Sequence, residues 1–266
     1  MKRLTVYLLM GFYSSLCLSV ELSLLPDKSL DVERQLLTFE NDNLVQHALL
    51  VVGSSAKLKS DTLIVMAHGF HPNPAHYGKI EGGVSSRPGN YYREWVNAYA
   101  KAGFNVLVPD YRGHNDSQGL SYTHQVGSVD FPEQYYALDL IASVHALQNN
   151  LQIKFLKLIL VGHSMGSPIA FYAAEQLGSQ VKLVSLWSSA SYKFPTVTST
   201  LKYVIHHGQY DEVTPITHLD YYLKNHKNQL VSMNVYETNA HLLSATDFEQ
   251  AVGLDIRLIN GILKDK

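Results

Sequence analysis

The sequence predicts one α/β domain with a mostly parallel central sheet that is covered by helices on both faces. Apolar runs long enough for buried strands alternate with segments of helical apolar spacing along most of the chain, and this alternation is typical of parallel sheets flanked by helices. With 46 % hydrophobic and 17 % charged residues, the 266-residue chain has an ordinary globular composition and can bury one large core. No repeat or linker divides the sequence, so we predict a single domain over residues 21–266.

The predicted elements begin with an antiparallel hairpin, residues 36–40 and 44–52, around the turn Asn41-Asp42-Asn43. A buried strand follows at 62–67, and the stretch from His71 to Asn90 has the Pro-, Gly- and Ser-rich composition of a loop. The further strands are expected at 104–108, 155–161, 181–187, 201–206 and 231–236. The helices are expected at 91–102, 133–148, after Ser164, around 217–225 and at 245–263.

Residues 1–20 have the pattern of a secretory signal. Lys2 and Arg3 supply the positive start, and an apolar stretch interrupted by serines follows up to Val20. This stretch is shorter than the roughly 20 apolar residues that span a membrane. We therefore expect an exported protein, secreted or periplasmic, with no stable membrane insertion after cleavage. The alternatives are an uncleaved anchor and a lipoprotein whose signal ends at Cys17, although Leu16 is large for the position before a modified cysteine.

Charge and cysteine content disfavour several other functions. A net charge of −2 and a pI near 6.7 give no indication of nucleic-acid binding. Cys17 is the single cysteine and lies in the predicted signal, so the mature chain can form no internal disulfide. The thirteen histidines are scattered, and His68, His71 and His76 lack a second ligand group at metal-site spacing. We expect no metal ion and no other cofactor.

The strongest chemical signal is the stretch Gly162-His163-Ser164-Met165-Gly166. It reads G-x-S-x-G between an apolar strand, 155–161, and the helix-forming segment 169–174, which is the context of a nucleophilic serine. The two glycines remove side chains that would collide at the sharp turn, and the backbone N–H groups of the next helix point toward developing negative charge. The pattern predicts a nucleophile at Ser164; a plain loop serine is the alternative.

Four motifs in order resemble the α/β-hydrolase family from about Leu36 to the C-terminus. His68-Gly69-Phe70 resembles its oxyanion loop, and Asp110-Tyr111-Arg112-Gly113-His114 its D-x-R-G-H turn. The Ser164 stretch resembles its nucleophile elbow, and the segment from His207 to Pro215 resembles the one that carries its acid. The resemblance implies an α/β-hydrolase fold and a serine hydrolase. Two departures, Asn115 and Thr214, are not expected to touch the chemistry directly.

The resemblance implies a catalytic triad of Ser164, Asp211 and His241. A serine hydroxyl needs a base, and His241 follows the strand 231–236 through a short loop that places it at the carboxyl edge of the sheet. The order Ser, Asp, His is that of the family, and Asp211 would orient His241. The alternatives are a surface role for His241, a helix-capping role for Asp211, and Asp110 as the acid.

By the family's geometry, the backbone N–H groups of Phe70 and Met165 would stabilise the oxyanion. The Phe70 side chain could also line the acyl pocket. Structural roles are expected for four neighbouring residues: His68, Arg112, His114 and His163.

Two loop lengths bear on the substrate. The stretch from Ser188 to Thr200 is too short for a lid of several helices, so no large lid is expected. The longer loop from His71 to Asn90 could form one wall of a cleft or a solvated surface loop. These lengths favour a small-molecule or partly polymeric acyl substrate. The leading hypothesis is hydrolysis of carboxylic esters; the alternatives are a peptidase or thioesterase, and a non-catalytic binding protein.

Overall fold

The computed structural model describes residues 20–24, 32–53, 61–71, 90–121, 133–150, 157–192 and 201–264. The predicted signal, except Val20, and the greater part of the long loop after His71 lie outside the described residues. None of the helices in these ranges has the length and apolar character needed to cross a membrane.

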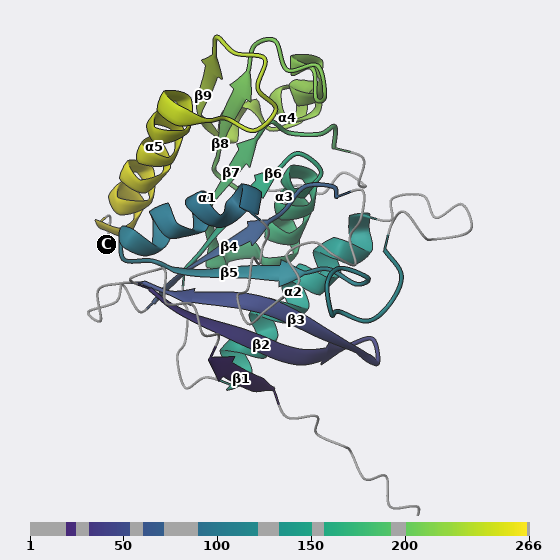
Figure 1. Cartoon of the computed structure of the whole chain (residues 1–266). Helices are drawn as coiled ribbons and strands as arrows, with labels where there is room; N and C mark the ends of the chain where they lie inside the picture. Colours follow the sequence, from purple (N-terminus) through teal and green to yellow (C-terminus); the bar gives the residue numbers. More distant parts are fainter. Residues whose placement is uncertain are drawn as a thin grey trace, which may run out of the picture.

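The described strands form one nine-stranded sheet in the order β1-β2-β3-β5-β4-β6-β7-β8-β9 (Figure 1). Strands β1 to β3 pair antiparallel, β3 pairs antiparallel with β5, and the pairs from β5 to β9 are parallel. This confirms the mostly parallel sheet. The strand bounds are Glu21–Leu24, Glu33–Asn41, Leu44–Val52, Thr62–Ala67, Asn105–Asp110, Lys157–His163, Val181–Trp187, Tyr203–Gly208 and Leu230–Tyr236, from β1 to β9.

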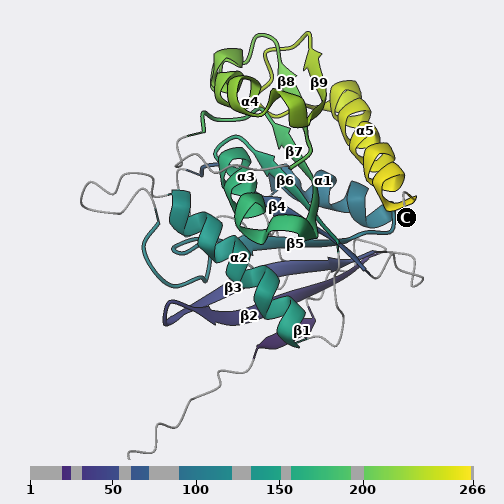
Figure 2. The same cartoon turned by 180° about the vertical axis from the view of Figure 1, so that it is seen from behind.

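Helices cover both faces of the sheet, as predicted. Helices α1 and α5 lie on one face (Figure 1), and α2, α3 and α4 lie on the other (Figure 2). Side chains of β4 alternate between the two cores because successive residues of a strand point to opposite faces: Leu63 and Val65 belong to one core and Ile64 to the other. The helix bounds are Asn90–Lys101, Glu133–Asn150, Gly166–Leu177, Asp220–Asn225 and Ala245–Lys264, from α1 to α5.

A buried carboxylate, Asp255, attaches α5 to the sheet. Its side chain is inaccessible to solvent and accepts hydrogen bonds from the hydroxyl groups of Tyr99 (2.8 Å) and Ser185 (2.7 Å). The indole N–H of Trp187 (3.2 Å) and Nε2 of His206 (3.0 Å) also face the carboxylate. A buried charge is tolerated only when it is hydrogen-bonded in this way, and its partners come from α1, β7 and β8.

Replacing Asp255 with alanine should destabilise the fold by about 3–5 kcal/mol, because several buried donors lose their acceptor at once. The matched control is Glu249→Ala on the exposed side of the same helix, which should change stability by less than about 0.5 kcal/mol. Melting temperatures measured under one buffer condition separate the two variants. Equal melting temperatures would mean that the Asp255 cluster does not hold the helix.

Candidate active site

Ser164 lies in a left-handed backbone conformation, φ 54°, at the turn between β6 and α3. The flanking glycines are required there. A Cβ at Gly162 would lie 2.4 Å from the carbonyl oxygen of Gly166, and a Cβ at Gly166 would lie 2.1 Å from that of Ala67. The next helix therefore packs directly against the strand, and Ser164 occupies the carboxyl edge of the sheet. Met165, one of the two predicted oxyanion donors, is the N-cap residue of α3.

Asp211 and His241 are brought together at the same edge. His241 Nδ1–H donates to Asp211 Oδ2 over 2.9 Å, while the backbone N–H groups of Val213 and Thr214 donate to Oδ1 over 2.9 and 3.0 Å. Burial acts to raise the pKa of Asp211, but the hydrogen bonds from Thr214 and His241 outweigh it and hold that pKa below its ordinary value. The carboxylate is thus ionised and fixed in orientation.

Thr214 touches both members of this pair, although the sequence did not lead us to expect it at the candidate site. Its hydroxyl oxygen lies 2.8 Å from Asp211 Oδ2, 3.3 Å from His241 Nδ1 and 2.9 Å from the carbonyl oxygen of Ser188. The segment after β8 folds back on itself, which turns the Thr214 side chain toward the carboxylate. A threonine three residues after a candidate acid was the only signal of this contact in the sequence.

In the part of the chain that the structure describes, no hydrogen bond joins Ser164 to His241. His163, which directly precedes the serine, links the elbow to His241: its ring lies 4.9 Å from that of His241 between centroids, and its Nε2 lies 3.0 Å from the His241 carbonyl oxygen. Hydrogen bonds between nucleophile and base are often long in unliganded sites and tighten when substrate binds.

The loop after β4 lies beside the serine. A Cβ at Gly69 would lie 3.1 Å from Ser164 Cβ. His68 Nδ1–H donates to the Gly69 carbonyl oxygen over 2.9 Å, and the Gly69 N–H donates to the Tyr92 hydroxyl over 2.8 Å. In a trans peptide the next N–H points opposite to the carbonyl, so His68 orients the N–H of Phe70. The Phe70 side chain is 51 % exposed.

The remaining predicted residues have structural contacts. Asp110, the rival acid, accepts a hydrogen bond from the Asn115 side chain over 2.7 Å, whereas His241 pairs with Asp211. Arg112 donates to Asp139 over 2.7 Å. His114 Nδ1–H donates to the Arg112 carbonyl oxygen over 3.2 Å, and burial lowers the pKa of His114 to about 4. These contacts agree with the structural roles expected for Arg112 and His114.

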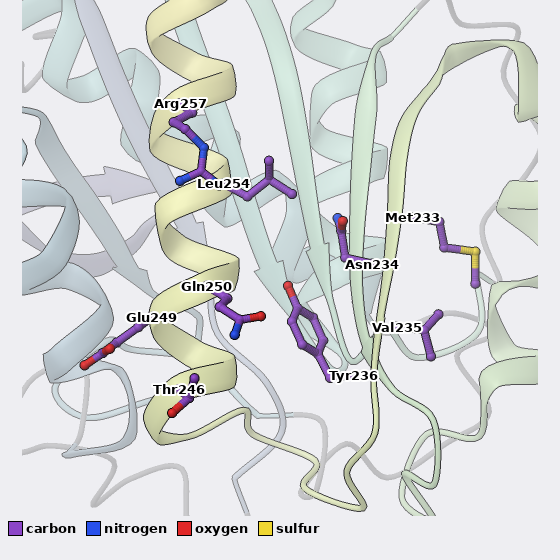
Figure 3. Close-up of a pocket in the computed structure, with 9 residues that line it drawn as sticks. All are labelled: Met233, Asn234, Val235, Tyr236, Thr246, Glu249, Gln250, Leu254 and Arg257. Atoms are coloured by element: carbon purple, nitrogen blue, oxygen red, sulfur yellow. The ribbon is translucent and has the colours of Figure 1, made fainter.

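Within the described residues, no group of three or more His, Cys, Asp or Glu side chains could hold a metal ion; His76 lies outside them. A polar groove lies between β9 and α5, where Asn234 and Tyr236 face the helix (Figure 3). Its lining includes none of Ser164, Asp211 and His241, so the groove is separate from the candidate active site.

Comparison with known proteins agrees with this geometry. A family model described as the alpha/beta hydrolase fold matches residues 62–204. No curated protein matches the chain significantly. Among solved structures, an alpha-beta serine hydrolase homologue from Coxiella burnetii has 15 % identity and a TM-score of 0.60, and the match covers 84 % of this chain and 94 % of that one.

Two further solved structures share the fold. One is an α/β serine hydrolase without a lid from Xanthomonas campestris, with 14 % identity, a TM-score of 0.59, and coverage of 87 % of this chain and 94 % of that one. The other is an esterase from Pyrococcus furiosus, with 17 % identity, a TM-score of 0.61, and coverage of 89 % and 91 %. Since the family model matches more than half of the sequence and the sheet, helices and elbow agree with it, the chain belongs to the α/β-hydrolase family.

Proposed function

We propose that the protein is a serine hydrolase that cleaves carboxylic esters through an acyl-enzyme on Ser164. The observation that carries the proposal is the Asp211–His241 hydrogen bond of 2.9 Å at the edge of the sheet where Ser164 lies in its strained turn. A serine on such a turn, next to a histidine that is oriented by a buried carboxylate, is the arrangement that activates a hydroxyl group as a nucleophile.

In the proposed mechanism, His241 Nε2 takes the proton of Ser164 as Oγ attacks the ester carbonyl carbon. The resulting oxyanion is held by the backbone N–H groups of Phe70 and Met165. His241 then gives its proton to the leaving alcohol, the C–O bond breaks, and the acyl group remains on Ser164. Water, deprotonated by His241, attacks the acyl-enzyme; the acid is released and Ser164 recovers its proton.

The protonation states support these roles. Asp211 accepts from Nδ1–H of His241, which leaves the Nε2 lone pair available to the serine proton. A second histidine near the serine, His163, has its pKa lowered to about 4, chiefly by burial. Both of its ring nitrogens are engaged, with Tyr92 and with the His241 backbone, so His163 is not a competing base.

A panel of substrates tests the proposal. p-Nitrophenyl esters of increasing acyl length, an acyl thioester and aminoacyl-anilides are compared by kcat/KM on the same preparation. We expect the esters to be the best substrates, because an alcohol leaves more easily than an amine. Faster cleavage of the anilides would favour a peptidase, and faster cleavage of the thioester a thioesterase. No turnover, together with no labelling by a fluorophosphonate, would indicate a non-catalytic protein.

A further inference from the structure

Three consecutive hydrogen bonds connect the loop after β4 with the loop that carries His241. The Gly69 N–H donates to the Tyr92 hydroxyl oxygen (2.8 Å), the Tyr92 O–H donates to His163 Nδ1 (2.8 Å), and His163 Nε2–H donates to the His241 carbonyl oxygen (3.0 Å). The four residues come from four separate parts of the chain. We refer to these bonds as the Tyr92–His163 relay.

The chemistry of its two ends fixes the direction of the relay. A backbone N–H can only donate, so Gly69 makes the Tyr92 oxygen an acceptor and leaves the Tyr92 proton for His163. A carbonyl oxygen can only accept, so His163 must carry its proton on Nε2. In the neutral ring, a proton on Nε2 leaves Nδ1 unprotonated, so Nδ1 accepts the Tyr92 O–H. Burial, which disfavours the imidazolium and lowers the pKa of His163 to about 4, supports that tautomer.

The relay is held rigidly. Tyr92 and His163 are 4 % and 6 % exposed, and the Trp95 ring stacks on Tyr92 and packs edge-on against His163. A Cβ at Gly69 would lie 3.0 Å from the Tyr92 hydroxyl and 3.2 Å from His163 Nδ1. Any side chain at Gly69 would therefore displace the relay.

Each end of the relay reaches one part of the proposed machinery. One end holds the amide of Gly69, which precedes the peptide that presents the Phe70 N–H. The other end holds the backbone of His241, the proposed base. We infer that Tyr92 and His163 are positioning residues, which keep the oxyanion loop and His241 in place relative to each other and to Ser164. This inference rests on the proposed function. Neither residue reaches the reacting atoms; they act through Gly69 and His241.

The first test removes single groups from the relay. Tyr92→Phe keeps the ring and deletes the hydroxyl, and His163→Leu keeps the approximate volume and deletes both nitrogens. We expect each to lower kcat roughly 10- to 100-fold, with KM nearly unchanged, because small misplacements of catalytic groups cost rate more than binding. His163→Gln, whose amide N–H can still donate to the His241 carbonyl oxygen, should recover part of the loss.

The matched control is Tyr99→Phe, the same substitution on the same helix. Tyr99 is also buried, and its hydroxyl donates to Asp255. Loss of the Tyr99 hydroxyl should lower the melting temperature, because a buried hydrogen bond is removed. It should leave kcat within about threefold, because Tyr99 is not part of the relay. Equal effects of Tyr92→Phe and Tyr99→Phe on kcat would overturn the inference. Melting temperatures confirm that each variant is folded, and His163→Gln serves if His163→Leu is not.

A double variant tests whether the relay acts as a unit. In that case Tyr92→Phe combined with His163→Leu should cost about as much kcat as either single change, because the first substitution already breaks the connection. Effects that multiply would show two independent contributions and would contradict the inference.

NMR keeps this test separate from that of the proposed function. If the wild-type protein has no hydrolase activity, the proposed function fails, but the relay can still be observed. The ¹⁵N shifts of His163 should report the Nε2–H tautomer, and the Nδ1–H proton of His241 should shift in Tyr92→Phe and not in Tyr99→Phe. An Nδ1–H tautomer of His163, or an unchanged His241 proton, would overturn the inference.

Discussion

Replacing Asp211 with asparagine should lower kcat by about 10⁴-fold while KM changes only a few-fold. The structure supplies the reason. Oδ1 of Asp211 accepts from two backbone N–H groups, so the oxygen of the asparagine amide will occupy that position. Its NH₂ group then replaces Oδ2 and faces His241 Nδ1. A donor at that place favours the opposite tautomer of His241, whose Nε2–H cannot accept the Ser164 proton.

The control for this variant is Asp110→Asn, the same change at the rival acid. Asp110 is buried and accepts from Asn115, so its loss should cost about 1–3 kcal/mol of stability without a comparable loss of kcat. The measurements are kcat, KM and melting temperature for both variants in one buffer. The acid assignment would be wrong if folded Asp110→Asn lost turnover while Asp211→Asn remained active.

Replacing Ser164 with alanine should lower kcat by about 10³-fold or more, because only the oxyanion donors and substrate binding would remain. Alanine keeps the Cβ at the position with φ 54°, so the backbone strain is unchanged and the protein should melt near the wild-type temperature. Labelling by a fluorophosphonate should disappear in the same variant.

Ser143→Ala is the matched control for the nucleophile. Ser143 is a buried serine on α2 whose hydroxyl donates to the Leu140 carbonyl oxygen over 2.7 Å. Its loss should cost about 0.5–1.5 kcal/mol of stability and leave labelling intact. If Ser164→Ala retained the label in a folded protein, another serine would be the nucleophile and the triad would have to be redrawn.

The sequence predicted the core of the fold because local patterns specify it. The strands at 62–67 and 181–187 have the predicted bounds, since short, mainly apolar and β-branched segments of about six residues favour buried strands. Strands β5, β6 and β8 end two residues later than predicted, at Asp110, His163 and Gly208. The polar or glycine residues at the ends of these strands interrupt the apolar pattern, while the backbone pairing continues. The short strand β1 at Glu21–Leu24 was not predicted, because four residues carry too weak a pattern.

The serine, aspartate and histidine of the candidate site could be proposed from motifs, since the glycine requirement of the elbow is local and the motif order is a property of the chain. The contacts of these residues with the side chains that support them could not be predicted. Thr214 holds Asp211 only because the segment after β8 folds back. The relay joins Tyr92 to His163, 71 residues apart in sequence, and Asp255 reaches Tyr99 across 156 residues. Hydrogen bonds depend on distance and direction in space, so only the folding of the loops and the packing of helices against the sheet decided these partners.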